Sequence, residues 1–168
     1  MALFGDDRRI RPARSGDGFD IRLPDMEREL LASLPGELVE LLDSSAGDPD
    51  AMTEDPALAR LFPDAYTAVD TGFNDEYRRL MTEDLRERHR AALETLAAGA
   101  QTNHIDTEEL HGWMTALASL RLVIGTRLGV TEDMDEIDEH HPNASAYALY
   151  GYLSWLQEQA VEALSSTL

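Results

Sequence analysis

The apolar residues of this chain recur mainly every three to four positions, which is the period of an α-helix with one buried side. In residues 25–42, for example, Met26, Leu30, Leu34 and Leu38 lie along one side of the expected helix. The same period predicts helices in five segments, which are residues 25–42, 55–62, 74–98, 106–128 and 144–164.

Residues with known preferences for helix ends mark the limits of these segments. Asp55 followed by Pro56 is typical of a helix start, and Asp106 with Glu109 matches a capping box. Pro35 should kink or split the first helix, because it lacks a backbone N–H. The other expected end signals are Gly99, Gly129 and Asn143.

Residues 8–23, RRIRPARSGDGFDIRL, show a period of two instead. Phe19, Ile21 and Leu23 alternate with polar residues after the reversal SGDG, which predicts a β-hairpin. Pro12 limits the first run to an edge strand. An isolated hairpin is marginal in water, so we expect this one to pack Phe19 and Ile21 against the helices.

These elements predict a mainly α protein, a compact bundle of about five helices with an N-terminal β-hairpin. A length of 168 residues fits a single domain, residues 1–168. Within it, residues 1–23 would form the hairpin arm and residues 25–165 the helical bundle.

The composition excludes several kinds of chemistry. The chain has no cysteine, which rules out disulfides, thiolate metal sites and cysteine nucleophiles. The formal net charge is −19, and all fourteen basic residues are arginine. Such a charge repels a phosphate backbone, so direct nucleic-acid binding by the whole domain is disfavoured. The N-terminus lacks a long apolar stretch, and we expect a cytoplasmic protein without a membrane span.

Two arginines interrupt the apolar segment LRLVIGTRLG near residues 120–129. Arg121 falls in line with Leu117 and Ile124 of the expected helix, so its permanently charged guanidinium should be largely buried and needs acceptors. The first interpretation is a structural ion pair with an acid from another segment, and the alternative is a socket for an anion or for an acidic group of a partner. The candidate acids are Glu158, Asp84 and Glu87.

The remaining features of this segment have simpler interpretations. Gly125, one turn after Arg121, leaves room for a neighbouring group to approach. Arg127 lies at the edge of the apolar stripe, where it would extend toward water or cap the last carbonyls of the helix.

The acidic loop at residues 131–141 could in principle bind a cation. However, Ile137 and Asp138 stand where a calcium loop needs an oxygen ligand and a glycine, and no HExxH spacing occurs. We therefore predict a solvated loop without a metal, and no cofactor elsewhere.

The last predicted helix is apolar on several sides. Tyr147, Tyr150 and Trp155 add aromatic surface beyond the stripe of leucines, so this helix is either central in the bundle or covered by another chain. Tyr147, Tyr150 and Trp155 are therefore candidate interface residues, in a homodimer or with a partner protein.

Four segments of the chain carry a resemblance to a known family. LARLFPDAY, EYRRLMTEDL, LRLVIGTRLGVTEDMD and AYALYGYLSWLQEQAVEAL resemble recurring segments of an actinobacterial family of unknown function, whose genes often lie beside the adaptor ClpS and a cysteine-biosynthesis cluster. One branch is described as an oxidative-stress transcriptional regulator that acts with a sigma factor. The resemblance implies a regulatory protein with RNA polymerase or a sigma factor as partner. Cysteine-based sensing does not transfer to a chain without cysteine.

The sequence is therefore compatible with three functions. The first is a non-enzymatic regulator that acts through protein contacts, and the acidic charge favours a basic partner. The second is a small-molecule or metal-dependent enzyme that uses the Arg121 region and the loop 131–141, although no catalytic motif is present. The third is direct DNA binding through the arginine-rich hairpin.

Overall fold

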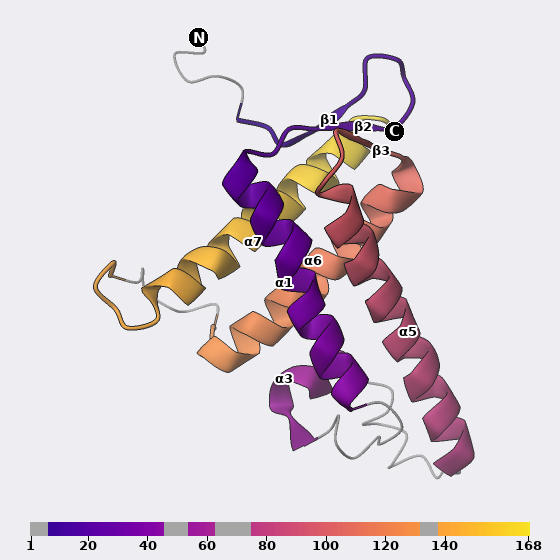
Figure 1. Ribbon diagram of the computed structural model, residues 1–168, viewed down its shortest axis with the longest axis vertical. Helices are drawn as coiled ribbons and strands as arrows, with labels where there is room; N and C mark the ends of the chain where they lie inside the picture. The colour runs from indigo at the N-terminus through magenta and orange to yellow at the C-terminus, as the bar shows by residue number, and fades with distance from the viewer. Residues whose placement is uncertain (1–6, 46–53, 63–74, 132–137) are drawn as a thin grey trace.

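The computed structural model describes residues 7–45, 54–62, 75–131 and 138–168 (Figure 1). These residues form five helices and a small sheet of three strands, so the predicted mainly α fold with an N-terminal hairpin is confirmed. The elements are β1 (Ile10–Pro12), β2 (Phe19–Ile21), α1 (Asp25–Ser44), α3 (Pro56–Ala59), α5 (Asp75–Gly99), β3 (His104–Ile105), α6 (Thr107–Leu128) and α7 (Ala144–Ser165).

Helix α6 is the central element of the bundle. It packs against α7, α5, α3 and α1, and Figure 1 shows α1 crossing in front of it. Leu110, Leu120 and Val123 of α6 are at most 5% exposed, and they spread over roughly 140° around the helix. A helix that is covered on several sides needs apolar residues around most of its circumference.

The sheet confirms the predicted hairpin and adds a strand. β1 and β2 are antiparallel, with Ile10 opposite Ile21, and β1 is an edge strand as Pro12 required. β3 pairs with the other edge of β2, which the sequence did not predict because two residues show no period. Gly18 permits this approach, since a Cβ there would lie 2.5 Å from the carbonyl oxygen of Ile105.

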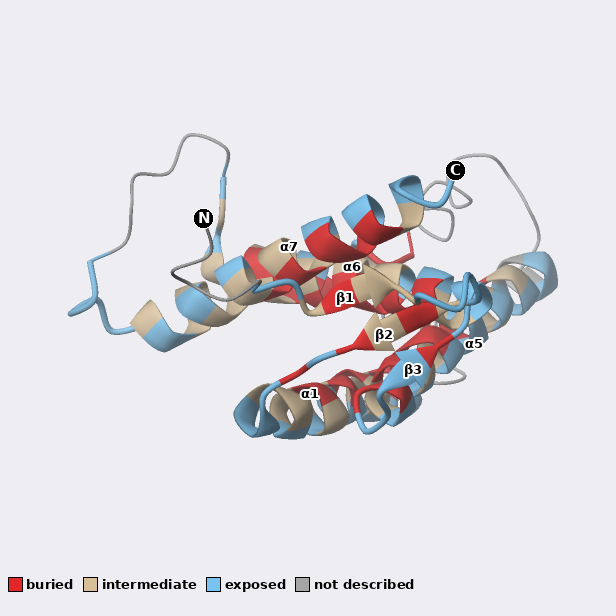
Figure 2. Cartoon of the chain, turned by 90° about the horizontal axis from the view of Figure 1, so that it is seen from above, coloured by how far each residue is buried: buried red, intermediate tan, exposed pale blue. Residues whose placement is uncertain are grey.

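The hairpin forms part of the core. Ile10, Phe19 and Ile21 are 1–2% exposed. Figures 1 and 2 show their strands, β1 and β2, at one end of the bundle beside α6 and α7. The expected packing of Phe19 and Ile21 on the helices is therefore confirmed.

Most of the predicted helix ends are correct. Asp106 and Glu109 form the capping box, with the Glu109 amide donating to Asp106 Oδ1 over 2.7 Å. Gly129 ends α6 in the left-handed conformation, with a φ of 69°. Asp55 accepts the Ala57 amide over 2.9 Å.

Two details of the helix ends differ from the expectation. Helix α1 runs from Asp25 to Ser44 without a break, so the buried Pro35 does not split it. Helix α7 begins after Asn143 as predicted, but the Asn143 side chain does not cap it, and the Asn143 backbone N–H donates to His141 Nδ1 over 3.0 Å.

Arg28 ties the start of α1 to the end of α5. Its Nη1 donates to the carbonyl oxygens of Ala100 and Thr102 over 2.9 and 2.8 Å, and its Nη2 donates to Asn103 Oδ1 over 2.8 Å. A cation suits this place because the last carbonyls of a helix lack internal partners and carry partial negative charge.

His89 links three helical segments in the interior. Its Nδ1 lies 3.0 Å from Ser119 Oγ on α6, and its Nε2 lies 3.0 Å from the carbonyl oxygen of Leu61 after α3. The ring also meets Phe62 edge-on, with centroids 5.7 Å apart. Burial lowers the pKa of His89 below its ordinary value, and the hydrogen bond with Leu61 opposes this shift only in part.

This lowered pKa predicts a loss of stability in mild acid. Unfolded chains take up a proton at this histidine near pH 6.5, whereas the folded protein resists it, so the free energy of unfolding should fall as the pH drops from about 7.5 to about 5.5. His89→Gln, which cannot titrate there, should show a flatter dependence in urea unfolding measured across that range. Exposed His111→Gln is the control and should keep the wild-type slope; equal slopes for all three proteins would contradict the prediction.

Candidate functional site

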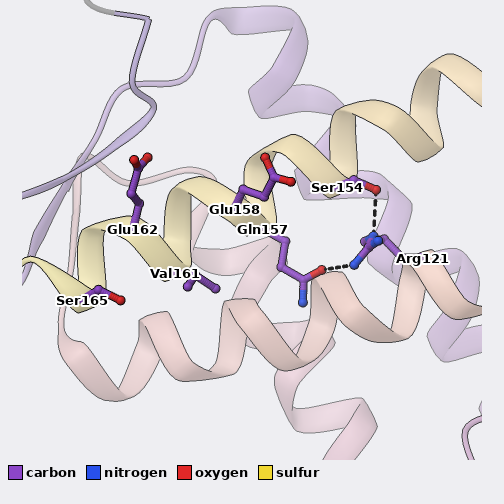
Figure 3. Close-up of a pocket in the computed structure, with 7 residues that line it drawn as sticks. All are labelled: Arg121, Ser154, Gln157, Glu158, Val161, Glu162 and Ser165. Carbon is purple, nitrogen blue, oxygen red and sulfur yellow. Dashed lines mark hydrogen bonds between the residues drawn. The ribbon is translucent and has the colours of Figure 1, made fainter.

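Arg121 joins α6 to α7 through uncharged groups. Its Nε donates to Ser154 Oγ over 2.8 Å, and its Nη1 donates to Gln157 Oε1 over 2.5 Å (Figure 3). The guanidinium carbon lies 5.5 Å from the centre of the Tyr150 ring, within the range of a cation–π contact. The partners come from another helix, as predicted.

The predicted nature of these partners is wrong. Within the described residues, Arg121 forms no ion pair, and it is half-buried rather than largely buried. Glu158 lines the same hollow, but its carboxylate points away from Arg121 (Figure 3). The other two candidates pair within α5, Asp84 with Arg88 and Glu87 with Arg86.

The physical reason for the error is the central place of α6. The sequence suggested one apolar side with Arg121 in its middle, but buried residues such as Trp113, Ala116 and Leu120 lie together on another side, roughly 80–140° around the helix from Arg121. Arg121 therefore lies at the margin between α6 and α7, where a partly hydrated guanidinium needs no carboxylate. Gly125 does leave room for a neighbour, because a Cβ there would lie 2.9 Å from Tyr150 Cε2.

A hollow of about 500 Å³ opens beside Arg121. In the described part of the chain, Arg121 Nη2 donates no hydrogen bond, so it is available to an acceptor from outside. The Ser154 hydroxyl donates to the Tyr150 carbonyl oxygen over 2.9 Å, and no histidine lines this hollow to act as its base. The arrangement suits binding of an acceptor better than catalysis. The lining residues are Arg121, Ser154, Gln157, Glu158, Val161, Glu162 and Ser165.

Arg127 forms an ion pair that the sequence did not predict. Its Nη2 lies 3.3 Å from Asp55 Oδ2, where the predicted role was to extend into water or cap the helix end. Asp55 thus caps α3 with one oxygen and meets α6 with the other. Both side chains are partly exposed, so the ion pair contributes little stability.

The contacts of the two arginines predict small and unequal effects. Arg121→Met should lower the free energy of unfolding by about 1 kcal/mol, because it removes two charge-assisted hydrogen bonds that are partly screened by water. Arg127→Met should lower it by less than about 0.5 kcal/mol. Urea unfolding of both variants tests this prediction. A loss of unfolding free energy above about 3 kcal/mol for Arg121→Met would instead support a buried ion pair at Arg121.

The three aromatic residues proposed as interface residues all have contacts within the chain. The Tyr147 hydroxyl donates to the Leu128 carbonyl oxygen over 3.0 Å, Tyr150 lies over Gly125, and Trp155 lies beneath Arg9 at 5.2 Å. All three are half-buried. They hold α7 on the bundle, and their contact with a partner stays a prediction.

A polar cluster joins the hairpin to α1 and α7, and the sequence did not reveal it. Arg9 donates two hydrogen bonds to the Glu27 carboxylate, from Nε to Oε2 over 2.9 Å and from Nη2 to Oε1 over 3.1 Å. The Tyr152 hydroxyl also donates to Glu27 Oε2 over 3.0 Å. The pKa of Tyr152 is raised, first by burial and then by the Glu27 charge, and the hydrogen bond to Glu27 raises the pKa of Arg9.

A second cluster surrounds the buried guanidinium of Arg86 on α5. Arg86 is 7% exposed, donates to Asp43 Oδ1 of α1 over 3.1 Å, and pairs with Glu83. Its hydrogen bond with Glu83 raises the pKa of Arg86 and lowers that of Glu83. Asp43 also accepts from Arg90 over 3.2 Å, so one acid serves two arginines. The buried guanidinium that meets carboxylates is therefore that of Arg86 and not that of Arg121, and the carboxylates of Asp43 and Glu83 remain partly exposed.

The prediction that the acidic loop 131–141 holds no metal lies largely outside the described residues, because these exclude 132–137. Among residues that are described, no three histidine, aspartate or glutamate side chains gather as a metal site would require. None of the described helices combines the length and apolar character of a membrane span.

The chain belongs to a family known as a domain of unknown function, DUF2017, which matches residues 7–164. This agrees with the family resemblance of its sequence segments. The chain is also similar to a protein of Mycobacterium leprae (strain TN) named "Putative oxidative stress regulator AosR". The two are 29% identical over 159 residues, which cover 84% of this chain and 72% of that protein. No solved structure matches the chain.

Proposed function

We propose that this protein is a non-enzymatic regulator of a stress response that acts by binding a protein with a basic contact surface. The name of the Mycobacterium leprae relative supports a regulatory role. By the family resemblance, the partner is RNA polymerase or a sigma factor.

The observation that carries this proposal is the use of the arginines inside the fold. At least seven of the described arginines donate to groups of the chain itself, and five of these seven pair with carboxylates; the seven are Arg9, Arg28, Arg86, Arg88, Arg90, Arg121 and Arg127, of which Arg28 and Arg121 donate to uncharged groups. Carboxylates, in contrast, are exposed along α1 and on α7. The surface therefore offers negative charge, which attracts a basic protein and steers its approach.

The same contacts weaken the case for DNA binding through the hairpin. Arg9 is held by Glu27 and covered on one side by Trp155. Arg14 and Arg22 are exposed, but two arginines next to a strongly acidic body provide little attraction for a phosphate backbone.

An enzymatic function gains no support from the described residues. His89 and Ser119 are paired like a base and a nucleophile, but Ser119 is 2% exposed and lies inside the core, where a substrate has no access. Ser154, the hydroxyl beside Arg121, has no histidine in the hollow that could act as its base.

The experiment is a pull-down of purified RNA polymerase core enzyme and purified sigma factors with the tagged 168-residue chain at increasing salt. We expect capture that weakens as salt rises, because opposite charges meet at the contact. Parallel retention of duplex DNA should stay at background. Retention of DNA without capture of either protein would refute the proposal.

A further inference from the structure

An apolar groove lies between α1 and α7, on the side of α7 opposite to the Arg121 hollow. It measures about 430 Å³, and it is lined by Met26, Glu27, Glu29, Leu30, Ser33 and Tyr152. Met26 is 83% exposed, which is unusual for a large apolar side chain. Its flexible thioether chain can adapt to a partner surface, as methionines do at many protein-binding sites.

The charges around this groove have one sign. Glu27 is already satisfied by Arg9 and Tyr152, whereas Glu29 is exposed at the rim and its carboxylate pairs with no described residue. No basic residue lines the groove. Arg28, the nearest cation on α1, turns inward to the carbonyl oxygens that end α5.

The acidic character continues along the exposed side of α1. The residues on this side recur at helical spacing, and all five are exposed: Met26, Glu29, Ser33, Glu37 and Glu40. From Glu29 to Glu40 this side extends over roughly 16 Å at the rise of an α-helix. An apolar groove thus continues into a line of three carboxylates.

We propose that the groove between α1 and α7 docks a basic amphipathic helix of a partner protein. A large apolar side chain of that helix would enter between Met26, Leu30 and Tyr152. Lysines or arginines of that helix, at the groove and roughly two and three turns beyond it, would meet Glu29, Glu37 and Glu40. This inference rests on the proposed function for its basic partner, and it adds the surface and the shape of the bound segment.

The test uses a synthetic probe, a fluorescent 15-residue helical peptide of leucine, lysine and alanine with leucines along one side. The chain should bind it saturably in fluorescence anisotropy, while a peptide with glutamate in place of lysine should not bind. In methyl NMR spectra, the Met26 resonance should shift most among the six methionines.

Two variants and a matched control locate the binding. Met26→Ala removes the apolar contact, and Glu29→Lys reverses the charge at the rim. Each variant should weaken binding of the probe peptide by about fivefold or more, because each removes a contact at the centre of the proposed site. Both residues are exposed, so the fold should persist, which circular dichroism checks. Glu158→Lys makes the same charge change on the opposite side of α7 and should change the affinity by less than about twofold.

Three outcomes would each overturn the proposal that the groove binds the probe peptide. They are equal weakening of binding by Glu158→Lys, unchanged affinity of the two groove variants, and no saturable binding by the wild type. These outcomes are separate from the pull-down. If RNA polymerase or sigma factor is captured equally by wild type, Met26→Ala and Glu29→Lys, the proposed function stands and the groove is not its contact surface. If the probe binds the groove but neither protein is captured, the groove stands and the proposed partner is wrong.

Discussion

Phe19→Ala should lower the free energy of unfolding by about 3–5 kcal/mol. Phe19 is 1% exposed and lies in the middle strand of the sheet, between β1 and β3. Truncation to alanine removes the ring from the contact between the hairpin and the helices and leaves a cavity that the paired strands cannot close. Urea unfolding followed by circular dichroism measures the effect.

The hairpin offers a control at its exposed end. Arg14→Ala should change stability by less than about 0.5 kcal/mol, because Arg14 is exposed at the reversal between the strands. Deletion of residues 1–22 should be more damaging than Phe19→Ala, since it also removes Ile10 and Ile21 from the core. A truncated chain with an unchanged melting temperature would mean that the hairpin does not pack on the bundle in solution.

Trp113→Ala is the second variant for which we expect a loss of about 3–5 kcal/mol. The Trp113 side chain is fully buried in α6, the helix on which the other helices pack. Its indole also lies against the backbone of Gly99 at the end of α5, so the cavity would open where two helices meet. The same urea titration applies, and a loss below about 1 kcal/mol would place Trp113 outside the core.

The contact with Gly99 permits a sharper test. A Cβ at Gly99 would lie 2.6 Å from Trp113 Nε1, so Gly99→Ala should cost about 1–3 kcal/mol. Gly151→Ala is the matched control on α7; nothing lies within 4 Å of its added methyl, so it should stabilise the helix by about 0.5–1 kcal/mol.

Trp113→Phe should relieve the collision, because phenylalanine lacks the atoms that the added methyl would meet. It also removes the indole Nε1, which is buried without a hydrogen-bond partner among the described residues. The double variant Gly99→Ala with Trp113→Phe should therefore be more stable than the sum of the single effects predicts, by about 0.5 kcal/mol or more. Simple additivity would contradict the direct contact.

Local signals in the sequence located most of the elements. The capping box at Asp106, the glycine at 129 and the alternation around Phe19 each depend on a few neighbouring residues, and all three are confirmed. The strand β3 escaped prediction because its two residues become a strand only by pairing with β2.

Local signals in the sequence did not predict which groups surround Arg121 and Arg86. The sequence singled out Arg121 as a residue in need of acceptors, and the structure supplies Ser154 and Gln157 from 33 and 36 residues further along the chain. The buried arginine that does meet carboxylates, Arg86 on α5, was not among the residues that the sequence singled out. Spacing within one helix cannot show which neighbouring helix covers it.

The sequence by itself determined the helices, their principal ends, the hairpin and the acidic character of the chain. These properties follow from backbone hydrogen bonding, side-chain period and composition, which act over short distances along the chain. Only the tertiary structure decided that α6 is central, that Arg9, Glu27 and Tyr152 meet, and that Met26 borders an open groove. The physical reason is that burial and charge pairing depend on groups far apart in sequence, which come together only when the helices pack.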